Sequence, residues 1–168
     1  MRLGHRMIRD QRITSHCGLV ARAFGATGIT YSGERDENLE KSIKKVVKNW
    51  GGSFEIKYEK NWKKVINTWK GKVVHLTMYG LPLEDKIDEI KEYKKNLLII
   101  VGSEKVPGDM YHLSDWNVAV TNQPHSEIAA LTMFLDRFFE GKELKRKFQL
   151  SKIRIVPQRK GKKTISKI

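Results

Sequence analysis

The sequence predicts an α/β protein with a mainly parallel sheet flanked by helices. Short apolar stretches alternate with stretches in which apolar residues recur at helical spacing, as expected when crossover helices connect parallel strands. Two of the apolar stretches, 97–101 and 116–120, end abruptly in loops of small and polar residues. A chain of 168 residues, of which 39% are hydrophobic, is long enough for one domain with a substantial core.

Helix caps, glycines and periodicity define the elements of the first half. Thr14 or Ser15 can cap the first helix, and Gly25 ends it. In the next two helices apolar residues recur every three or four positions, whereas the strands are short and apolar or alternate in character. The expected elements are a helix over 14–24, a strand over 28–31, a helix over 36–50, a strand over 54–58, a helix over 62–69 and a strand over 72–78.

The same signals define the second half. A break at 79–82, which contains Gly80 and Pro82, precedes a helix over 84–93. The two apolar strands 97–101 and 116–120 follow, and then a helix over 126–139. Residues 150–156 are expected to form a late strand or hairpin arm, and the rest of the chain is expected to be flexible. We therefore expect one domain over 1–140 and a C-terminal extension over 141–168.

The net charge of +14 is concentrated at the two ends of the chain. Residues 141–168 hold eleven Lys or Arg against one acid, Glu143, and the first twelve residues add a smaller arginine cluster. Basic ends of this kind are typical of proteins that bind a phosphate backbone, although a solvated tail or a binder of another anionic surface is the alternative. The candidate RNA-binding residues are Arg6, Arg9, Arg12, Lys145, Arg146, Lys147, Arg154, Arg159 and Lys160.

Several function classes lack their sequence signals. The single Cys17 has no partner for a disulfide or a CxxC metal site, and it is expected to pack within a helix. The five histidines show no metal-binding spacing, so no metal is expected. Neither a Walker A loop nor GxSxG is present, and no apolar run is long enough for a membrane span. These absences favour a reducing, cytoplasmic setting.

Three strand-end loops are candidates for one composite pocket. They cover 76–82, 102–108 and 121–126, and carboxyl ends of neighbouring parallel strands are where α/β proteins bind small ligands. The alternative for the second loop is an ordinary βα turn. For the third loop it is helix capping by Asn122 or Ser126, with Pro124 in the first turn. A basic protein with such a pocket is suited to chemistry on nucleic acid.

These residues resemble the SPOUT class of RNA methyltransferases, and within it the archaeal tRNA cytidine-56 2′-O-methyltransferase family. The matching stretches are 3–6 (LGHR), 14–28 (TSHCGLVARAFGATG), 76–80, 102–107 (GSEKVP) and 117–131 (NVAVTNQPHSEIAAL). The resemblance implies a deep trefoil knot over about 74–140, a homodimer with active sites at the subunit interface, and methyl transfer from S-adenosylmethionine to a ribose of tRNA.

The resemblance also implies roles for individual residues. Arg22 matches the motif arginine of ribose-methylating members, whereas His16 stands where their motif has Asn. Because a guanidinium stays protonated, Arg22 would act by stabilising the developing alkoxide, with Glu104 as a possible orienting partner or a structural acid. The residues implied to hold the cofactor are Leu76, Thr77, Leu81, Gly102, Ser103, Glu104, Lys105, Val106, Val118, Val120, Thr121, Asn122, Gln123, Pro124, His125, Ser126 and Glu127.

Two other functions are compatible with the sequence. One is a non-catalytic RNA-binding protein that keeps the same fold. The other is a SPOUT enzyme that methylates a base nitrogen or another RNA nucleotide, and the ribose-type arginine at position 22 argues against the base-methylating form. Cofactor binding discriminates the first alternative from an enzyme, and mapping of the methylated nucleotide discriminates the second.

Overall fold

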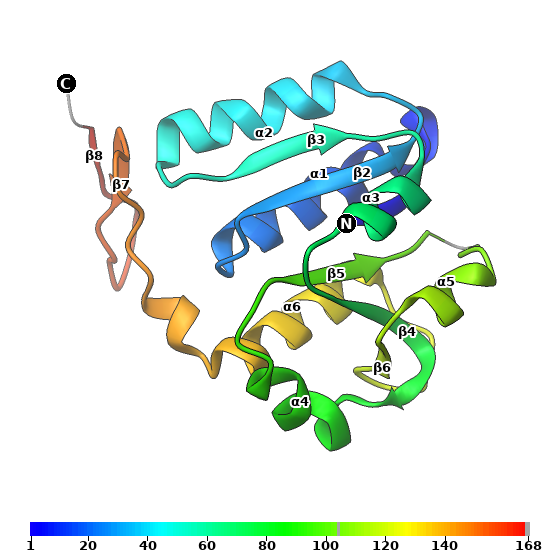
Figure 1. Ribbon diagram of the computed structural model, residues 1–168. Helices are drawn as coiled ribbons and strands as arrows, with labels where there is room; N and C mark the ends of the chain where they lie inside the picture. The colour runs from blue at the N-terminus through cyan, green and yellow to red at the C-terminus, as the bar shows by residue number, and fades with distance from the viewer. Residues whose placement is uncertain (104, 167–168) are drawn as a thin grey trace.

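A parallel six-stranded sheet forms the centre of the molecule within the described residues, which are 1–103 and 105–166 of the computed structural model (Figure 1). The strand order is β3-β2-β1-β5-β4-β6, and every neighbouring pair is parallel. The strands are β1 (Arg2–His5), β2 (Gly28–Gly33), β3 (Glu55–Tyr58), β4 (Lys72–Pro82), β5 (Leu97–Val101) and β6 (Trp116–Ala119).

Helices cover both faces of this sheet. They are α1 (Met7–Ala23), α2 (Glu37–Trp50), α3 (Trp62–Thr68), α4 (Leu83–Glu92), α5 (Asp109–Leu113) and α6 (Glu127–Phe139), followed by the 3₁₀ turn η1 (Lys142–Lys145). The larger apolar core includes Ile43 of α2, Ile90 of α4 and Phe134 of α6. The smaller core joins Ile66 of α3 and Met110 of α5 to the other face of the sheet. This arrangement explains why the central strand β5 is apolar throughout.

The first strand and the start of α1 were not predicted from the sequence. β1 carries Arg2 and His5, both completely buried, so the strand does not read as an apolar run. Helix α1 begins at Met7, where Asp10 accepts hydrogen bonds from the Arg6 main-chain N at 3.2 Å and from its side-chain Nε at 3.0 Å. Thr14, which we expected to be a cap, lies inside the helix and is bonded to His5 Nδ1 at 2.9 Å.

The C-terminal segment forms a separate antiparallel hairpin. Strand β7 (Ile153–Ile155) pairs with β8 (Thr164–Ser166), and β7 lies against α2. The first arm agrees with the predicted late strand, and β8 forms in a stretch that we expected to be flexible. Figure 1 shows this hairpin beside the amino ends of the main sheet. Within the described part of the chain no helix is long and apolar enough to cross a membrane.

Candidate functional site

The three predicted loops lie at one edge of the sheet. Strands β5, β4 and β6 are neighbours in the sheet and run parallel, so their carboxyl ends open in the same direction. Strand β4 pairs with β6 twice, because Leu76 and Leu81 both oppose Val118. Residues 77–80 therefore leave the sheet and return to it. The result is an irregular strand end directly between the loops that follow β5 and β6.

Gly80 lies at the closest approach of two main chains. A Cβ at this position would be 2.5 Å from Val118 N and 2.6 Å from Asn117 C, which is too close for any side chain. Only glycine therefore allows β4 to return to the sheet beside β6 at this point. The contact fixes the first loop relative to the third.

Asn122 fixes the same two loops through its side chain. Its Nδ2 donates to Met78 O at 2.7 Å and to Gly80 O at 3.1 Å, so the third loop satisfies carbonyl groups of the first. Of the two predicted helix caps, Ser126 is the one that caps α6, since its Oγ accepts from Ala129 N at 3.2 Å. Pro124 precedes the helix and is exposed.

A buried polar cluster joins β4, β6 and α5 near these strand ends. His75 is completely buried, its Nδ1 lies 2.9 Å from Asn117 Oδ1, and its ring meets Tyr111 edge-on at 4.9 Å. Asn117 Nδ2 donates to Tyr111 O at 2.8 Å, so Asn117 Oδ1 is the acceptor for a proton on His75 Nδ1. Tyr111 OH in turn lies 3.2 Å from Thr77 Oγ1. Burial lowers the pKa of His75, which is therefore neutral.

The predicted cofactor residues differ in what they expose. Leu76 and Val118 are buried and belong to the larger apolar core. The more accessible residues are Leu81, Lys105, Thr121, Asn122, Gln123, Pro124 and Ser126. Thr77, Gly102, Ser103, Val106, Val120, His125 and Glu127 are partly buried. Glu104 lies outside the described residues.

Glu127 is paired with a buried arginine of β1. The completely buried Arg2 lies between Glu127, at 3.3 Å, and Asp10, at 3.6 Å. Burial alone would raise the pKa of Asp10, but hydrogen bonds from Arg6 and the charge of Arg2 outweigh burial and lower it. This charged group connects the first turn of α6 to the first turn of α1. Sequence reasoning missed it, because nothing in the sequence marks Arg2 as buried.

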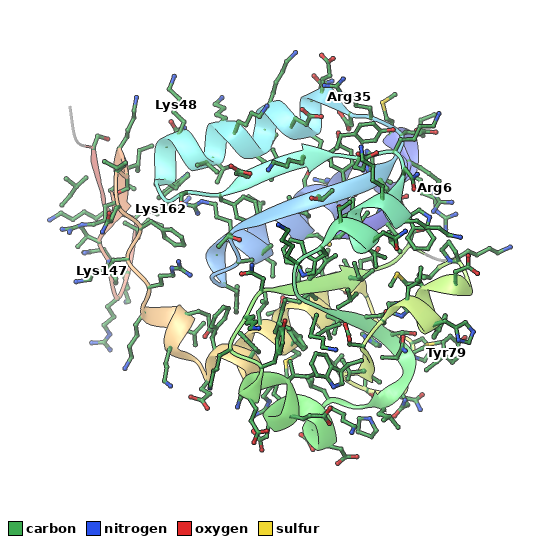
Figure 2. All side chains as sticks on the ribbon, viewed as in Figure 1. Arg6, Arg35, Lys48, Tyr79, Lys147 and Lys162 are labelled. Atoms are coloured by element: carbon green, nitrogen blue, oxygen red, sulfur yellow. The ribbon has the colours of Figure 1, made fainter. Side chains whose placement is uncertain are left out.

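Arg6 lies at the same edge as the loops. It lines an open cavity of about 570 Å³ together with Gly4 and His5 of β1 and with Ser103 and Lys105 of the second loop. Figure 2 shows Arg6 and Tyr79 on the same side of the molecule. The exposed residues Arg9 and Arg12 follow on the first turns of α1. The N-terminal arginine cluster is therefore close to the candidate pocket.

Arg22 lies at the opposite edge of the sheet. The 17 residues of α1 span roughly 25 Å, and Arg22 belongs to the last turn of the helix. Its side chain is buried, its Nη2 donates to Gly51 O at 2.6 Å, and its guanidinium stacks on the Phe148 ring at 4.3 Å. The structure thus does not bring Arg22 together with the cofactor loops in this chain. Its catalytic role, like the orienting role of Glu104, stays a prediction from resemblance.

The basic C-terminal residues lie at that opposite edge as well. Lys147 and Lys162 are labelled in Figure 2 beside the hairpin, away from Arg6 and Tyr79. The predicted RNA-binding residues Lys145, Arg146, Lys147, Arg154, Arg159 and Lys160 are all exposed there. The two basic ends of the sequence are therefore separated by the length of the sheet.

The described residues form neither a cluster of metal-ligand side chains nor an accessible thiol. No group of three or more His, Cys, Asp or Glu side chains within the described residues could hold a metal ion. Cys17 is completely buried, and burial raises the pKa of its thiol to about 12. A thiol with that pKa is almost entirely protonated at neutral pH and is a poor nucleophile. A cavity of about 400 Å³ near Cys17 has an apolar lining that includes Ala21, Leu131 and Phe138.

Solved structures define the class of fold. The chain resembles the SpoU methyltransferase AviRb from Streptomyces viridochromogenes in complex with AdoMet, with a TM-score of 0.60 and 16% identity. It also resembles a TrmH/SpoU tRNA modifying enzyme from A. aeolicus, with a TM-score of 0.58 and 13% identity. The matches cover 84% of this chain in both cases, and 57% and 74% of the other chains, respectively. The protein therefore has the SPOUT methyltransferase fold, and the predicted fold class is confirmed.

Sequence comparisons then define the family. Residues 50–165 match the family model described as "tRNA ribose 2′-O-methyltransferase, aTrm56". Proteins named tRNA (cytidine(56)-2′-O)-methyltransferase from Pyrococcus horikoshii and Methanopyrus kandleri are each 54% identical to this chain. These matches cover 98% and 97% of this chain, and 83% and 93% of the relatives. The chain belongs to the aTrm56 family of tRNA ribose 2′-O-methyltransferases, as the sequence motifs indicated.

Proposed function

We infer that this protein transfers a methyl group from S-adenosylmethionine to the ribose 2′-hydroxyl of cytidine 56 in the T-loop of tRNA. The observation that carries this inference is the 54% identity, over nearly the whole chain, to proteins named for that reaction. The loops at the carboxyl edge of β5, β4 and β6 supply a suitable place for the cofactor. The T-loop nucleotide comes from the relatives alone.

The residues at this edge fit S-adenosylmethionine. Leu81 is 57% exposed and offers an apolar surface to a purine ring. The exposed segment 121–126 offers main-chain and amide groups to the polar parts of the molecule. We propose that the described members of the predicted set hold the cofactor, with Leu76 and Val118 contributing main-chain groups. Glu127 is engaged with Arg2, so its contribution is to hold α6 in place.

S-adenosylmethionine supplies an electrophilic methyl group when it is bound. Transfer would break the sulfur–methyl bond as the oxygen–methyl bond forms and would release the 2′-hydroxyl proton to solvent, giving a methylated ribose and S-adenosylhomocysteine. The protein must hold the hydroxyl in line with the methyl and stabilise the negative charge that develops on the oxygen. We propose that Arg6, Arg9 and Arg12 approach the tRNA backbone at this edge.

We propose that the protein acts as a homodimer. Ile8 is fully exposed and Leu19 is 38% exposed, and both lie on one stripe of α1 because eleven residues complete about three helical turns. Met133 of the neighbouring helix α6 is also exposed, at 43%. Burial of such a stripe against a second copy would remove apolar surface from water. The arginine cluster at the start of α1 would then border the interface.

The topology of the knot and the cellular setting are also proposals. We propose a trefoil knot over about 74–140, the region in which β4 pairs twice with β6. We keep the division into a domain over 1–140 and an extension over 141–168. Because tRNA is the proposed substrate, we propose the cytoplasm as the place of action.

Methyl transfer to defined tRNA transcripts tests the function. We expect labelled S-adenosylmethionine to modify a transcript with cytidine 56, and a transcript with uridine 56 to receive no label there. Transfer that continues at another nucleotide in the uridine transcript would contradict the assignment. Absence of both transfer and heat of binding in cofactor calorimetry would favour a non-catalytic RNA-binding protein.

A further inference from the structure

Arg22, at the end of α1, contacts both the turn after α2 and the C-terminal segment. Its side chain is 8% exposed at the end of α1. Nη2 donates to the carbonyl of Gly51, which follows α2, and the guanidinium carbon lies over the Phe148 ring, 4.3 Å from its centroid. Arg22 therefore joins α1, the end of α2 and the C-terminal segment.

Further contacts hold the C-terminal segment 146–152 against the same place. Arg146 Nη1 donates to Gly25 O at 2.9 Å, just beyond the end of α1. The main-chain N of Gly52 donates to Gln149 O at 2.8 Å, and that of Lys152 donates to Asn49 O at 2.9 Å. The segment is thus docked by two arginine side chains and two main-chain hydrogen bonds on either side of Phe148.

The turn after α2 is shaped for this segment. Gly51 has a φ of 76°, and a Cβ at this position would overlap Gln149 O. A Cβ at Gly52 would be 2.7 Å from the Phe148 ring. The pair of glycines therefore does more than end the helix, since it leaves the space in which the C-terminal segment lies.

Docking of the segment creates a continuous basic surface. The exposed Lys45 and Lys48 of α2 lie on the helix that β7 contacts, and the hairpin adds Lys152 and Arg154 (Figure 2, where Lys48, Lys147 and Lys162 are labelled). None of Lys45, Lys48, Lys147, Lys152 and Arg154 forms an ion pair with the residues that the structure describes. Unpaired cations gathered on one surface repel one another until a polyanion neutralises them.

We propose that the C-terminal segment 146–152, docked through Phe148 against Arg22 and Gly52, forms with the end of α2 a surface for the tRNA backbone, remote from the cofactor loops of the same chain. The inference rests on the proposed function, because it takes tRNA as the ligand. A tRNA is long enough to reach from the cofactor edge to the opposite edge of this sheet. The remote surface contributes affinity and orientation, and the chemistry takes place at the cofactor loops.

Full-length Phe148→Ala and Gly52→Ala variants test the docking, because the first removes the ring that Arg22 contacts and the second places a methyl group 2.7 Å from that ring. We expect each to weaken tRNA binding and raise KM for tRNA by about tenfold at physiological salt, because several phosphate contacts lose their fixed position. The kcat at saturating tRNA and the Kd for S-adenosylmethionine should stay within about twofold of wild type. The double variant should bind tRNA no less tightly than the more impaired single variant, because both changes act on the same contact. Phe148→Tyr keeps an aromatic ring over Arg22, and it should retain most of the affinity.

Three results would overturn the docking role. They are a fall in kcat with unchanged KM, tRNA affinity that is unchanged in both single variants, and effects that multiply in the double variant. Direct tRNA binding is measured alongside methyl transfer, so failure of the proposed reaction in the wild-type protein is recognised separately. Phe148 is only partly buried and lies in the C-terminal segment, so its replacement leaves the core intact.

A pair of lysines on α2 tests the surface. We expect Lys48→Ala to reduce the salt dependence of tRNA binding by about one phosphate contact. Lys41 is the matched control, because it lies on the same helix but pairs with Glu37 at 3.9 Å, farther from the hairpin. The Lys41→Ala variant should keep the wild-type salt slope. Equal slopes for both variants would refute the placement of the surface.

Discussion

At the scale of single residues, Gly80 and Asn122 determine how the loops meet. Gly80 permits two main chains to touch, and Asn122 binds the carbonyl groups that this contact leaves at the surface. Both residues act through the main chain of a loop. The geometry of the proposed cofactor site therefore depends on contacts that these two residues make with the main chain.

A Gly80→Ala variant tests this dependence. The added methyl group would lie 2.5 Å from Val118 N, so the first loop must move away from the third. We expect the affinity for S-adenosylmethionine to fall about tenfold or more, on the order of 1.4 kcal/mol, when it is measured by calorimetry. Gly108→Ala is the control, because a Cβ there meets nothing within 4 Å. Equal affinity in the Gly80 variant and the control would contradict this role.

The sequence predicted the roles of loop residues better than the surroundings of Arg22. Loop composition offered Asn122 and Ser126 as alternative caps of α6, and the structure shows that Ser126 is the cap whereas Asn122 binds the first loop. The motif match at Arg22 specifies a residue on a helix but not which end of the sheet that residue reaches. Burial of Arg22 and its stacking on Phe148, 126 positions away in sequence, depend on a long-range contact that no local pattern encodes.

At the scale of elements, β4 is the most unusual part of the fold. It pairs with β5 along its first half, and its end returns to β6 after the excursion of residues 77–80. The sequence predicted the first part of this strand and a break at 79–82, but local periodicity could not show that the chain returns to the sheet. Strand β1 was missed for a related reason, since its buried Arg2 and His5 are compensated by distant partners.

The buried His75 at the centre of β4 makes stability depend on pH. Burial lowers its pKa in the folded protein, so between that value and about 6.5 the unfolded chain binds more protons. Its contribution is fully present above pH 6.5 and is lost as the pH falls below that value. We expect the free energy of unfolding to fall more between pH 7.5 and 5.5 in wild type than in a His75→Gln variant. Denaturant titrations at both pH values measure this difference, and an equal fall in the two proteins would disprove it.

At the scale of the whole molecule, the two basic ends have separate positions. The N-terminal arginines lie beside the cofactor loops, whereas the C-terminal segment lies beside the amino ends of the strands (Figures 1 and 2). Composition alone predicted a protein that binds a phosphate backbone, which agrees with a tRNA substrate. It could not show that the two basic ends lie at opposite edges of the sheet. The fold shows that a substrate contacting both must span the sheet, which suits a tRNA better than a short oligonucleotide.

The most direct test of the central claim is methyl transfer to a tRNA in which only the 2′-hydroxyl of cytidine 56 is absent. A tRNA assembled with 2′-deoxycytidine at this position keeps the base and the overall shape, so binding should stay close to that of the unmodified tRNA. We predict that it receives no label from S-adenosylmethionine, whereas the matched ribose form is labelled at that nucleotide. Labelling of the deoxy form at the same nucleotide would mean that the base is the acceptor, and it would contradict the assignment of this protein as a ribose methyltransferase acting on cytidine 56.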